Sequence, residues 1–223
     1  MGQYFKWINV EKKEYICPYD FALGCKRVES SYKGNPLLCA LRELFSQEWK
    51  GDKVIFIGDE FKLPDNIADE PFKTLYEHTL QCGYPGDSNE AIIELYKNVS
   101  CLFKEAEEIA REEIGYYIED LKEGKCRINE YGINTDNPFE RLFLRKGKSS
   151  RYTINHTKKV YYESDAVKVF YPDNTECKFT DPLPLLMCYG NSVDIGPWVG
   201  DIIGVSDEKI DGYTFLKEVH IGW

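Results

Sequence analysis

The sequence lacks the patterns that would place the chain in a membrane or around a metal ion. No apolar run approaches the roughly 20 residues of a transmembrane helix, and residues 1–7 hold no apolar core of a secretory signal. The eight cysteines are scattered, without a Cys-x-x-C spacing. We therefore expect a cytoplasmic protein with reduced thiols, outside the membrane and without a metal ion or other cofactor.

Positive charge is in short supply as well. The chain of 223 residues has 28 Lys and Arg against 38 Asp and Glu, which gives a formal net charge of -10. Such an excess of negative charge repels the phosphate backbone of nucleic acids, so nucleic acid is not an expected partner. A local basic strip is interrupted by Gly and Ser and is typical of a solvated connector. Its members are Arg141, Arg145, Lys146, Lys148 and Arg151.

Signatures of catalysis are missing too. The three histidines lie far apart in the sequence, and neither H-E-x-x-H, nor G-x-S-x-G, nor a phosphate-binding G-x-x-x-x-G-K-[ST] occurs. Carboxylates are plentiful, however, and Asp52 with Asp59 and Asp201 with Asp207 form two similarly spaced pairs. These pairs leave a metal-dependent hydrolase open as an alternative function.

What the sequence does contain is a repeat. "INVEKKEY" at residues 8–15 returns as "INHTKKVY" at 154–161, and "WKGDKVIFIGDE" at 49–60 returns as "WVGDIIGVSDE" at 198–208. The first match alone is expected by chance about once in a chain of this length, but the second follows at nearly the same separation and repeats a rare Trp. A Pro-Leu-Leu lies between the two segments in both halves. The order and spacing indicate an internal duplication.

We expect one domain over residues 1–223. The first copy covers residues 3–62, a helical insert and connector covers 63–150, the second copy covers 151–210, and a C-terminal strand covers 211–223. The insert contains two predicted helices, over residues 68–83 and 88–125, because apolar residues recur at helical spacing, in the second helix from Ile92 to Phe103. Gly115 is a predicted interruption of the second helix.

Local patterns predict the elements of each copy. Residues 4–17 alternate and are rich in aromatic and β-branched side chains, which predicts a β-hairpin with Asn9 at the turn, and residues 151–164 predict a second hairpin. Asn35 is a predicted N-cap for an amphipathic helix that begins at Pro36, whereas its counterpart after residue 181 is short or absent. The expected class is α+β: an internally duplicated hairpin and strand module forms an antiparallel or mixed sheet, with the inserted helices packed on it.

The repeated polar and aromatic residues permit two interpretations. Asn and Gly-Asp commonly serve turns, in which the Asn or Asp side chain bonds the backbone and Gly permits a tight bend. Alternatively, two copies around a pseudo-two-fold axis could form a cleft for a nucleotide-like ligand, with Lys on phosphate, Trp or Tyr on a base, and Asp on ribose or an amine. The candidate ligand-binding residues are Asn9, Lys12, Lys13, Tyr15, Trp49, Asp52, Asn155, Lys158, Lys159, Tyr161, Trp198 and Asp201.

A resemblance rests on these same motifs. The opening Met-Gly-Gln-Tyr, the Asn-x-x-Lys-Lys-x-Tyr motif and the Trp-x-Gly-Asp motif resemble a group of small uncharacterised bacterial and phage proteins. The resemblance covers both terminal blocks and not residues 64–147. It implies a bacterial or phage setting and no particular activity.

These observations favour a non-catalytic intracellular binding protein. Its partner would be a nucleotide-like small molecule that it sequesters, or a host defence protein that it inhibits, in the second case through the helical insert. The alternative is a metal-dependent hydrolase that acts on a nucleotide or phosphoester through the repeated aspartates. The sequence leaves self-association into a homo-oligomer open.

Overall fold

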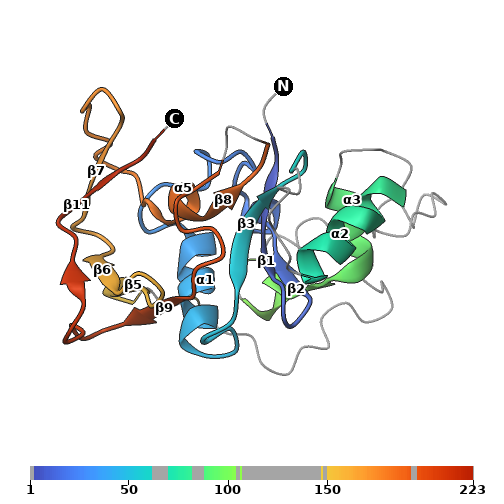
Figure 1. Cartoon of the computed structure of the whole chain (residues 1–223), viewed down its shortest axis with the longest axis horizontal. Coiled ribbons are helices and arrows are strands. Elements are labelled where there is room, and N and C mark those ends of the chain that lie inside the picture. Colours follow the sequence, from blue (N-terminus) through green and yellow to red (C-terminus); the bar gives the residue numbers. More distant parts are fainter. Residues whose placement is uncertain are drawn as a thin grey trace, which may run out of the picture.

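A computed structural model of the chain describes residues 3–61, 70–81, 88–103, 106, 147, 150–191 and 195–222. Within these ranges the helices and strands form an α+β fold with mixed sheets, which confirms the predicted class (Figure 1). The five-stranded sheet has the order β4 (Lys97–Asn98), β2 (Glu14–Ile16), β1 (Phe5–Asn9), β3 (Val54–Gly58) and β8 (Cys188–Tyr189). The four-stranded sheet has the order β10 (Thr214–Phe215), β6 (Val160–Glu163), β5 (Tyr152–Asn155) and β9 (Ile203–Ser206). A two-stranded sheet joins β11 (Glu218–His220) to β7 (Lys168–Phe170).

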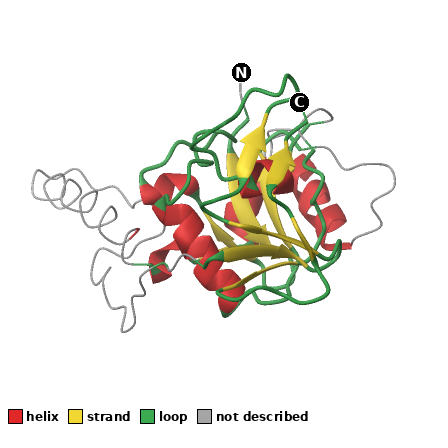
Figure 2. Ribbon diagram, turned by 90° about the vertical axis from the view of Figure 1, so that its left-hand side faces the viewer, coloured by secondary structure: helices red, strands yellow, loops and turns green. Residues whose placement is uncertain are grey.

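Strand β3 is apolar at nearly every position because both faces of the five-stranded sheet are covered. Val54 and Phe56 belong to a core cluster with the helix α1 (Pro36–Ser46), whereas Ile55 and Ile57 belong to a second cluster on the opposite face. The helices α2 (Glu70–Gln81) and α3 (Ser88–Leu95) contribute side chains to that second cluster. Figure 2 shows strands in the middle of the molecule with helices on either side. Alternate side chains of one strand thus enter two separate cores.

Helix α1 begins where the sequence predicts. The side chain of Asn35 accepts a hydrogen bond from the backbone N–H of Leu38 at 2.8 Å, and Pro36 occupies the first helical position, where no backbone N–H is required. A cap of this kind stabilises a helix by about 1 kcal/mol. In the second copy the helix α5 (Leu183–Met187) is short, as predicted, and Asp181 accepts a bond from the N–H of Leu183 at 3.0 Å.

The helix predicted over residues 88–125 is wrong between Leu95 and Phe103, and apart from Ala106 its remainder lies outside the described residues. The chain instead forms the short strand β4 and a 3-10 turn, η2 (Ser100–Leu102). The side chain of Asn98 accepts a bond from the N–H of Ser100 at 2.9 Å, which offers the backbone an alternative to the helix. Tertiary pairing with the first hairpin then overrides the helical spacing of the apolar residues.

The two copies have the same pairing register. Asn9 lies opposite Val54 between β1 and β3, and Asn155 lies opposite Ile203 between β5 and β9. A parallel edge strand is added to each hairpin at the equivalent place. The N–H of Lys97 donates to the carbonyl of Lys13 at 2.8 Å, and the N–H of Thr214 donates to the carbonyl of Lys159 at 2.9 Å. The structural similarity of the two copies therefore extends beyond residues 62 and 210, which are their predicted ends.

The copies meet at equivalent residues. An isolated antiparallel bridge joins Lys53 to Ile202, each of which directly follows the Asp of its own Trp-x-Gly-Asp segment. Helix α1 of the first copy contacts β9 of the second, and α5 of the second copy contacts β3 of the first. An antiparallel bridge has a local two-fold axis between its residues, so the copies are related by a pseudo-two-fold axis at this bridge. Their hairpins lie in separate sheets that this bridge links, whereas β8 of the second copy pairs with β3 in the sheet of the first.

A buried ion pair joins the helical parts of the two copies. Arg42 of α1 and Asp181 before α5 have side chains that are 0% and 1% exposed, and an Nη atom of Arg42 bonds a carboxylate oxygen of Asp181. Tyr162 also donates to Asp181 at 3.4 Å. The favourable interaction with Asp181 raises the pKa of Arg42, although burial acts in the opposite direction as the largest single influence. A buried charge of this kind is tolerated only when it is paired.

Most of the predicted connector and its basic strip lie outside the described residues, apart from Arg151, which pairs with Glu163 at 2.9 Å. None of the described helices is both long and apolar enough to cross a bilayer.

Candidate functional site

In the first copy, Asn9 connects the hairpin turn to the Trp-x-Gly-Asp segment. Its Oδ1 accepts from the N–H of Lys12 at 2.9 Å, and its Nδ2 donates to Oδ2 of Asp52 at 2.8 Å. The Nζ of Lys12 lies 3.2 Å from the same Asp52 oxygen. Three of the predicted site residues thus form one network, in which a fully buried amide links the turn to a carboxylate.

The second copy repeats this network bond for bond. Oδ1 of Asn155 accepts from the N–H of Lys158 at 2.8 Å, and Nδ2 donates to Oδ2 of Asp201 at 2.7 Å. The Nζ of Lys158 lies 3.0 Å from that oxygen. The side chains of Lys12 and Lys158 are 40% and 45% exposed, so each ammonium group reaches solvent while its aspartate fixes its position.

The backbone of both turns is matched as well. Lys13 and Lys159 both have a φ of 53°, and Gly51 and Gly200 both have a φ of 81°. Glycine suits the second pair because the left-handed region carries no steric cost for it. For lysine the same region costs about 1–2 kcal/mol, and the side chains of Lys13 and Lys159 are exposed.

The aromatic members of the motif lie in the cores. Tyr15 and Tyr161 are 7% and 6% exposed, and Trp49 and Trp198 are 0% and 5% exposed. The indole N–H of Trp49 donates to Glu14 at 2.8 Å. These side chains pack the hairpins against the rest of the protein, and the exposed polar groups of the motif are therefore its lysines.

The pseudo-two-fold axis brings the two networks together. Asp52 and Asp201 directly precede the bridged residues Lys53 and Ile202, and such diagonal neighbours of an antiparallel pair lie roughly 7–8 Å apart. We use the name lysine face for the exposed lysines of the two hairpin turns together with Lys50 of the first Trp-x-Gly-Asp segment. It consists of the exposed residues Lys12, Lys13, Lys50, Lys158 and Lys159.

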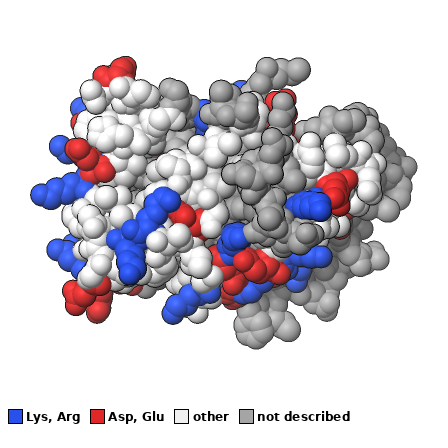
Figure 3. Space-filling view, viewed as in Figure 1, with Lys and Arg blue, Asp and Glu red and all other residues white. Residues whose placement is uncertain are grey.

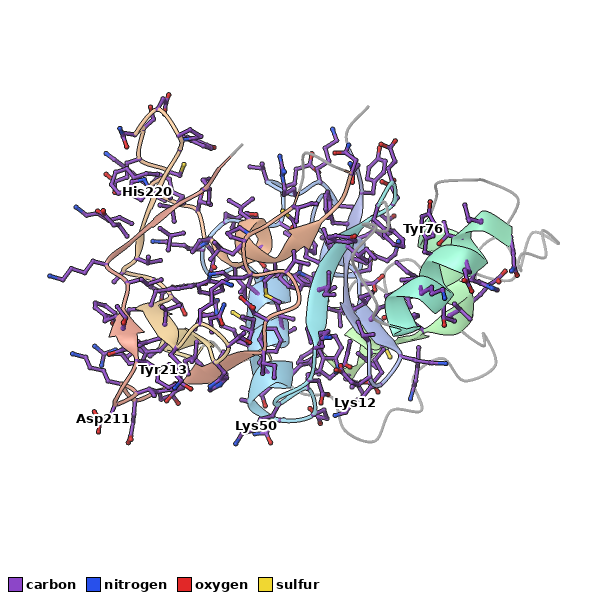
Figure 4. The ribbon with its side chains drawn as sticks, viewed as in Figure 1. Lys12, Lys50, Tyr76, Asp211, Tyr213 and His220 are labelled. Carbon is purple, nitrogen blue, oxygen red and sulfur yellow. The ribbon has the colours of Figure 1, made fainter. Side chains whose placement is uncertain are left out.

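Figure 4 shows Lys12, Lys50 and Tyr213 along the same lower edge of the molecule. In Figure 3 this edge carries Lys and Arg side chains next to Asp and Glu side chains. Lys and Arg side chains therefore lie beside carboxylates along this edge.

His156 and Lys50 are neighbours of the networks that the repeat did not reveal. His156 lies 3.2 Å from the hydroxyl of Tyr213, and burial together with the positive charge of Lys50 lowers its pKa. Lys50 belongs to the first copy and His156 to the second, so their interaction crosses the pseudo-two-fold axis. The repeat could not identify them because neither residue has a counterpart of its own type in the other copy.

The second aspartates of the predicted pairs have a different role. Asp59 accepts a bond from the N–H of Tyr4 at 3.1 Å, and Asp207 accepts one from the N–H of Arg151 at 3.3 Å. Each carboxylate thus holds the start of its own hairpin. Among the described residues, no three His, Cys, Asp or Glu side chains gather into a group that could hold a metal ion.

Comparisons with known proteins add no relative. Neither the protein-family models, nor the curated proteins, nor the solved structures against which the chain was searched match it. The geometry of the lysine face is therefore the feature that bears on function.

Proposed function

We propose that this protein is a non-catalytic, cytoplasmic binding protein whose lysine face takes an anionic, nucleotide-like ligand. The observation that carries the proposal is the meeting of two matched Asn-Lys-Asp networks at the Lys53–Ile202 bridge. Lysine ammonium groups bind phosphate oxygens through charge-assisted hydrogen bonds, and each network holds one such group beside its aspartate.

The positions of the lysines support this function. The protein carries a net charge of -10, so a group of exposed lysines at one edge departs from its average surface. Asp52 and Asp201 hold the neighbouring lysines by ion pairs. The lysine side chains would therefore lose less conformational entropy when a ligand binds. Two networks about an axis suit a ligand with two anionic groups, or two similar ligands side by side.

The resemblance to bacterial and phage proteins gives the proposal a setting. A small protein that binds a nucleotide-like signal without converting it would act by sequestration. The second partner that we propose is a host defence protein, which the helical insert would bind.

The test is to purify the protein under native conditions, incubate it with a panel of nucleoside mono-, di- and triphosphates and cyclic nucleotides, and release bound ligand by heat. Parallel samples contain Mg²⁺ or Mn²⁺. We expect an intact ligand to be released in both conditions. A converted ligand in the metal-containing samples would instead identify the alternative, a hydrolase. Failure of every member of the panel to bind would refute the nucleotide proposal.

A further inference from the structure

Two cysteines far from the lysine motif are brought together at the end of the first hairpin. Because Trp7 lies opposite Ile16 in the β1–β2 pair, Cys17 emerges beside Lys6 as β2 ends. The chain then turns through η1 (Pro18–Phe21) and returns, so that the carbonyl of Cys25 accepts from the N–H of Phe5 at 2.7 Å. Cys25 thus bonds the backbone of β1 just beyond the end of β2.

The two thiols are neighbours. Each lies close enough to the other to shift its pKa, and both residues pack on the apolar cluster that α2 and α3 help to form. Cys17 is 8% exposed, whereas Cys25 is half-buried, so an oxidant in solution would reach Cys25 first.

The segment Asn98–Ser100 holds the start of the loop between the two cysteines. The N–H of Cys17 donates to the hydroxyl of Ser100 at 3.1 Å, and the carboxylate of Asp20 accepts from Asn98 at 3.0 Å. Three other described cysteines have a different environment, because each thiol lies near a backbone carbonyl. These are Cys101, Cys177 and Cys188.

We propose that Cys17 and Cys25 form a redox-active dithiol that a peroxide-class oxidant converts to an intramolecular disulfide. Both free thiols lie beside the start of β1, because Cys17 comes opposite Lys6 and the carbonyl of Cys25 bonds Phe5, and they provide a sheltered resolving cysteine and a half-exposed attacking cysteine. The site goes beyond the proposed ligand binding, since it lies at the opposite end of β1 from Asn9 and Lys12.

The charge environment makes Cys25 the attacking thiol. The hydrogen bond from Cys17 lowers the pKa of Cys25 to about 7, with a further contribution from the positive charge of Lys6, although burial and Asp20 act in the opposite direction. The same contact, together with burial, raises the pKa of Cys17. At neutral pH a large fraction of Cys25 is therefore the thiolate, which is the nucleophilic form.

The reaction balances with hydrogen peroxide as the oxidant. The Cys25 thiolate attacks one peroxide oxygen, the O–O bond breaks, and hydroxide leaves and takes a proton to become water, which gives a sulfenic acid. The sulfur of Cys17 then attacks the sulfur of Cys25, its thiol proton joins the departing hydroxyl group, and a second water leaves. Two thiols are oxidised to one disulfide and one peroxide is reduced to two waters.

The sequence offers a direct assay. Trypsin cleaves after Lys13 and Lys26, and the peptide Glu14–Lys26 contains Cys17 and Cys25 and no other cysteine. The protein is treated with hydrogen peroxide, its free thiols are blocked with iodoacetamide, and the digest is analysed by mass spectrometry. We expect this peptide to lose two hydrogen atoms and both alkylation sites, and to regain both sites after dithiothreitol.

Matched variants complete the test. In Cys17→Ser, peroxide should leave Cys25 as a sulfenic acid that dimedone traps, whereas Cys188→Ser should form the disulfide as the unaltered protein does. The rate at which iodoacetamide alkylates Cys25 in Cys17→Ser should fall relative to the unaltered protein at pH 7, because the thiol that lowers its pKa is gone. A peptide that stays doubly alkylated after peroxide, or that is linked to another cysteine peptide, would overturn the proposal.

Discussion

Replacement of Asn155 by alanine tests whether the repeated Asn is a structural link. Asn155 is fully buried, donates to the charged carboxylate of Asp201 at 2.7 Å and accepts from the N–H of Lys158 at 2.8 Å. A bond to a charged partner contributes roughly 1.5–3 kcal/mol and a neutral bond roughly 0.5–1.5 kcal/mol. We therefore expect Asn155→Ala to lower the free energy of unfolding by about 2–4 kcal/mol.

Urea-induced unfolding followed by tryptophan fluorescence measures this change, with the slope against urea as a check that the unfolded state is unaltered. Asn9→Ala is the matched variant in the first copy and should cost a similar amount, because Asn9 makes the same two bonds. The double variant Asn155→Ala, Asp201→Ala should show a coupling of about 1 kcal/mol. Strict additivity, or a loss below about 0.5 kcal/mol for Asn155→Ala, would refute the reasoning.

Three further predictions concern other parts of the structure. Asp181→Asn leaves the buried guanidinium of Arg42 without its counter-charge and should cost about 3–5 kcal/mol in the free energy of unfolding, measured in urea. Gly200→Ala should cost about 1–2 kcal/mol, because φ is 81° there, and thermal unfolding would reveal it. The midpoint of the His156 titration in NMR should lie below the ordinary value of about 6.5 and rise in Lys50→Gln. Because folding lowers the pKa of His156, the unfolded chain binds a proton at this residue more readily than the folded protein does. The free energy of unfolding should therefore decrease as pH falls below about 6.5, and His156→Gln should make this decrease smaller.

The local elements of each copy could be predicted from the sequence because their signals are short-range. Asn35 with Pro36 predicted the start of α1, and the alternating residues around Asn9 predicted the first hairpin. The similar spacing between the repeated motifs also predicted that the two copies fold alike, since similar motifs joined by segments of similar length favour the same pairing.

The rest of the site depends on contacts that no local pattern contains. Apolar residues keep helical spacing past Leu95, yet the helix ends there. The chain instead pairs with the edge of the first hairpin, where the N–H of Lys97 donates to the carbonyl of Lys13. The packing of Trp49 in the core, the bridge at Lys53 and the meeting of Cys17 with Cys25 arise from tertiary structure alone.

The most direct test of the central proposal removes two charges of the lysine face and keeps its backbone. Asn tolerates a positive φ, so Lys13→Asn, Lys159→Asn should retain the fold, and Lys178→Asn, Lys217→Asn changes the net charge equally at exposed residues elsewhere. Isothermal titration calorimetry with the tightest-binding nucleotide of the panel compares both with the unaltered protein. We predict at least roughly tenfold weaker binding for the first double variant, because each lost charge-assisted contact is worth about 1.5–3 kcal/mol, and unchanged binding for the second. Equal affinity of the first variant and the unaltered protein would contradict the proposal.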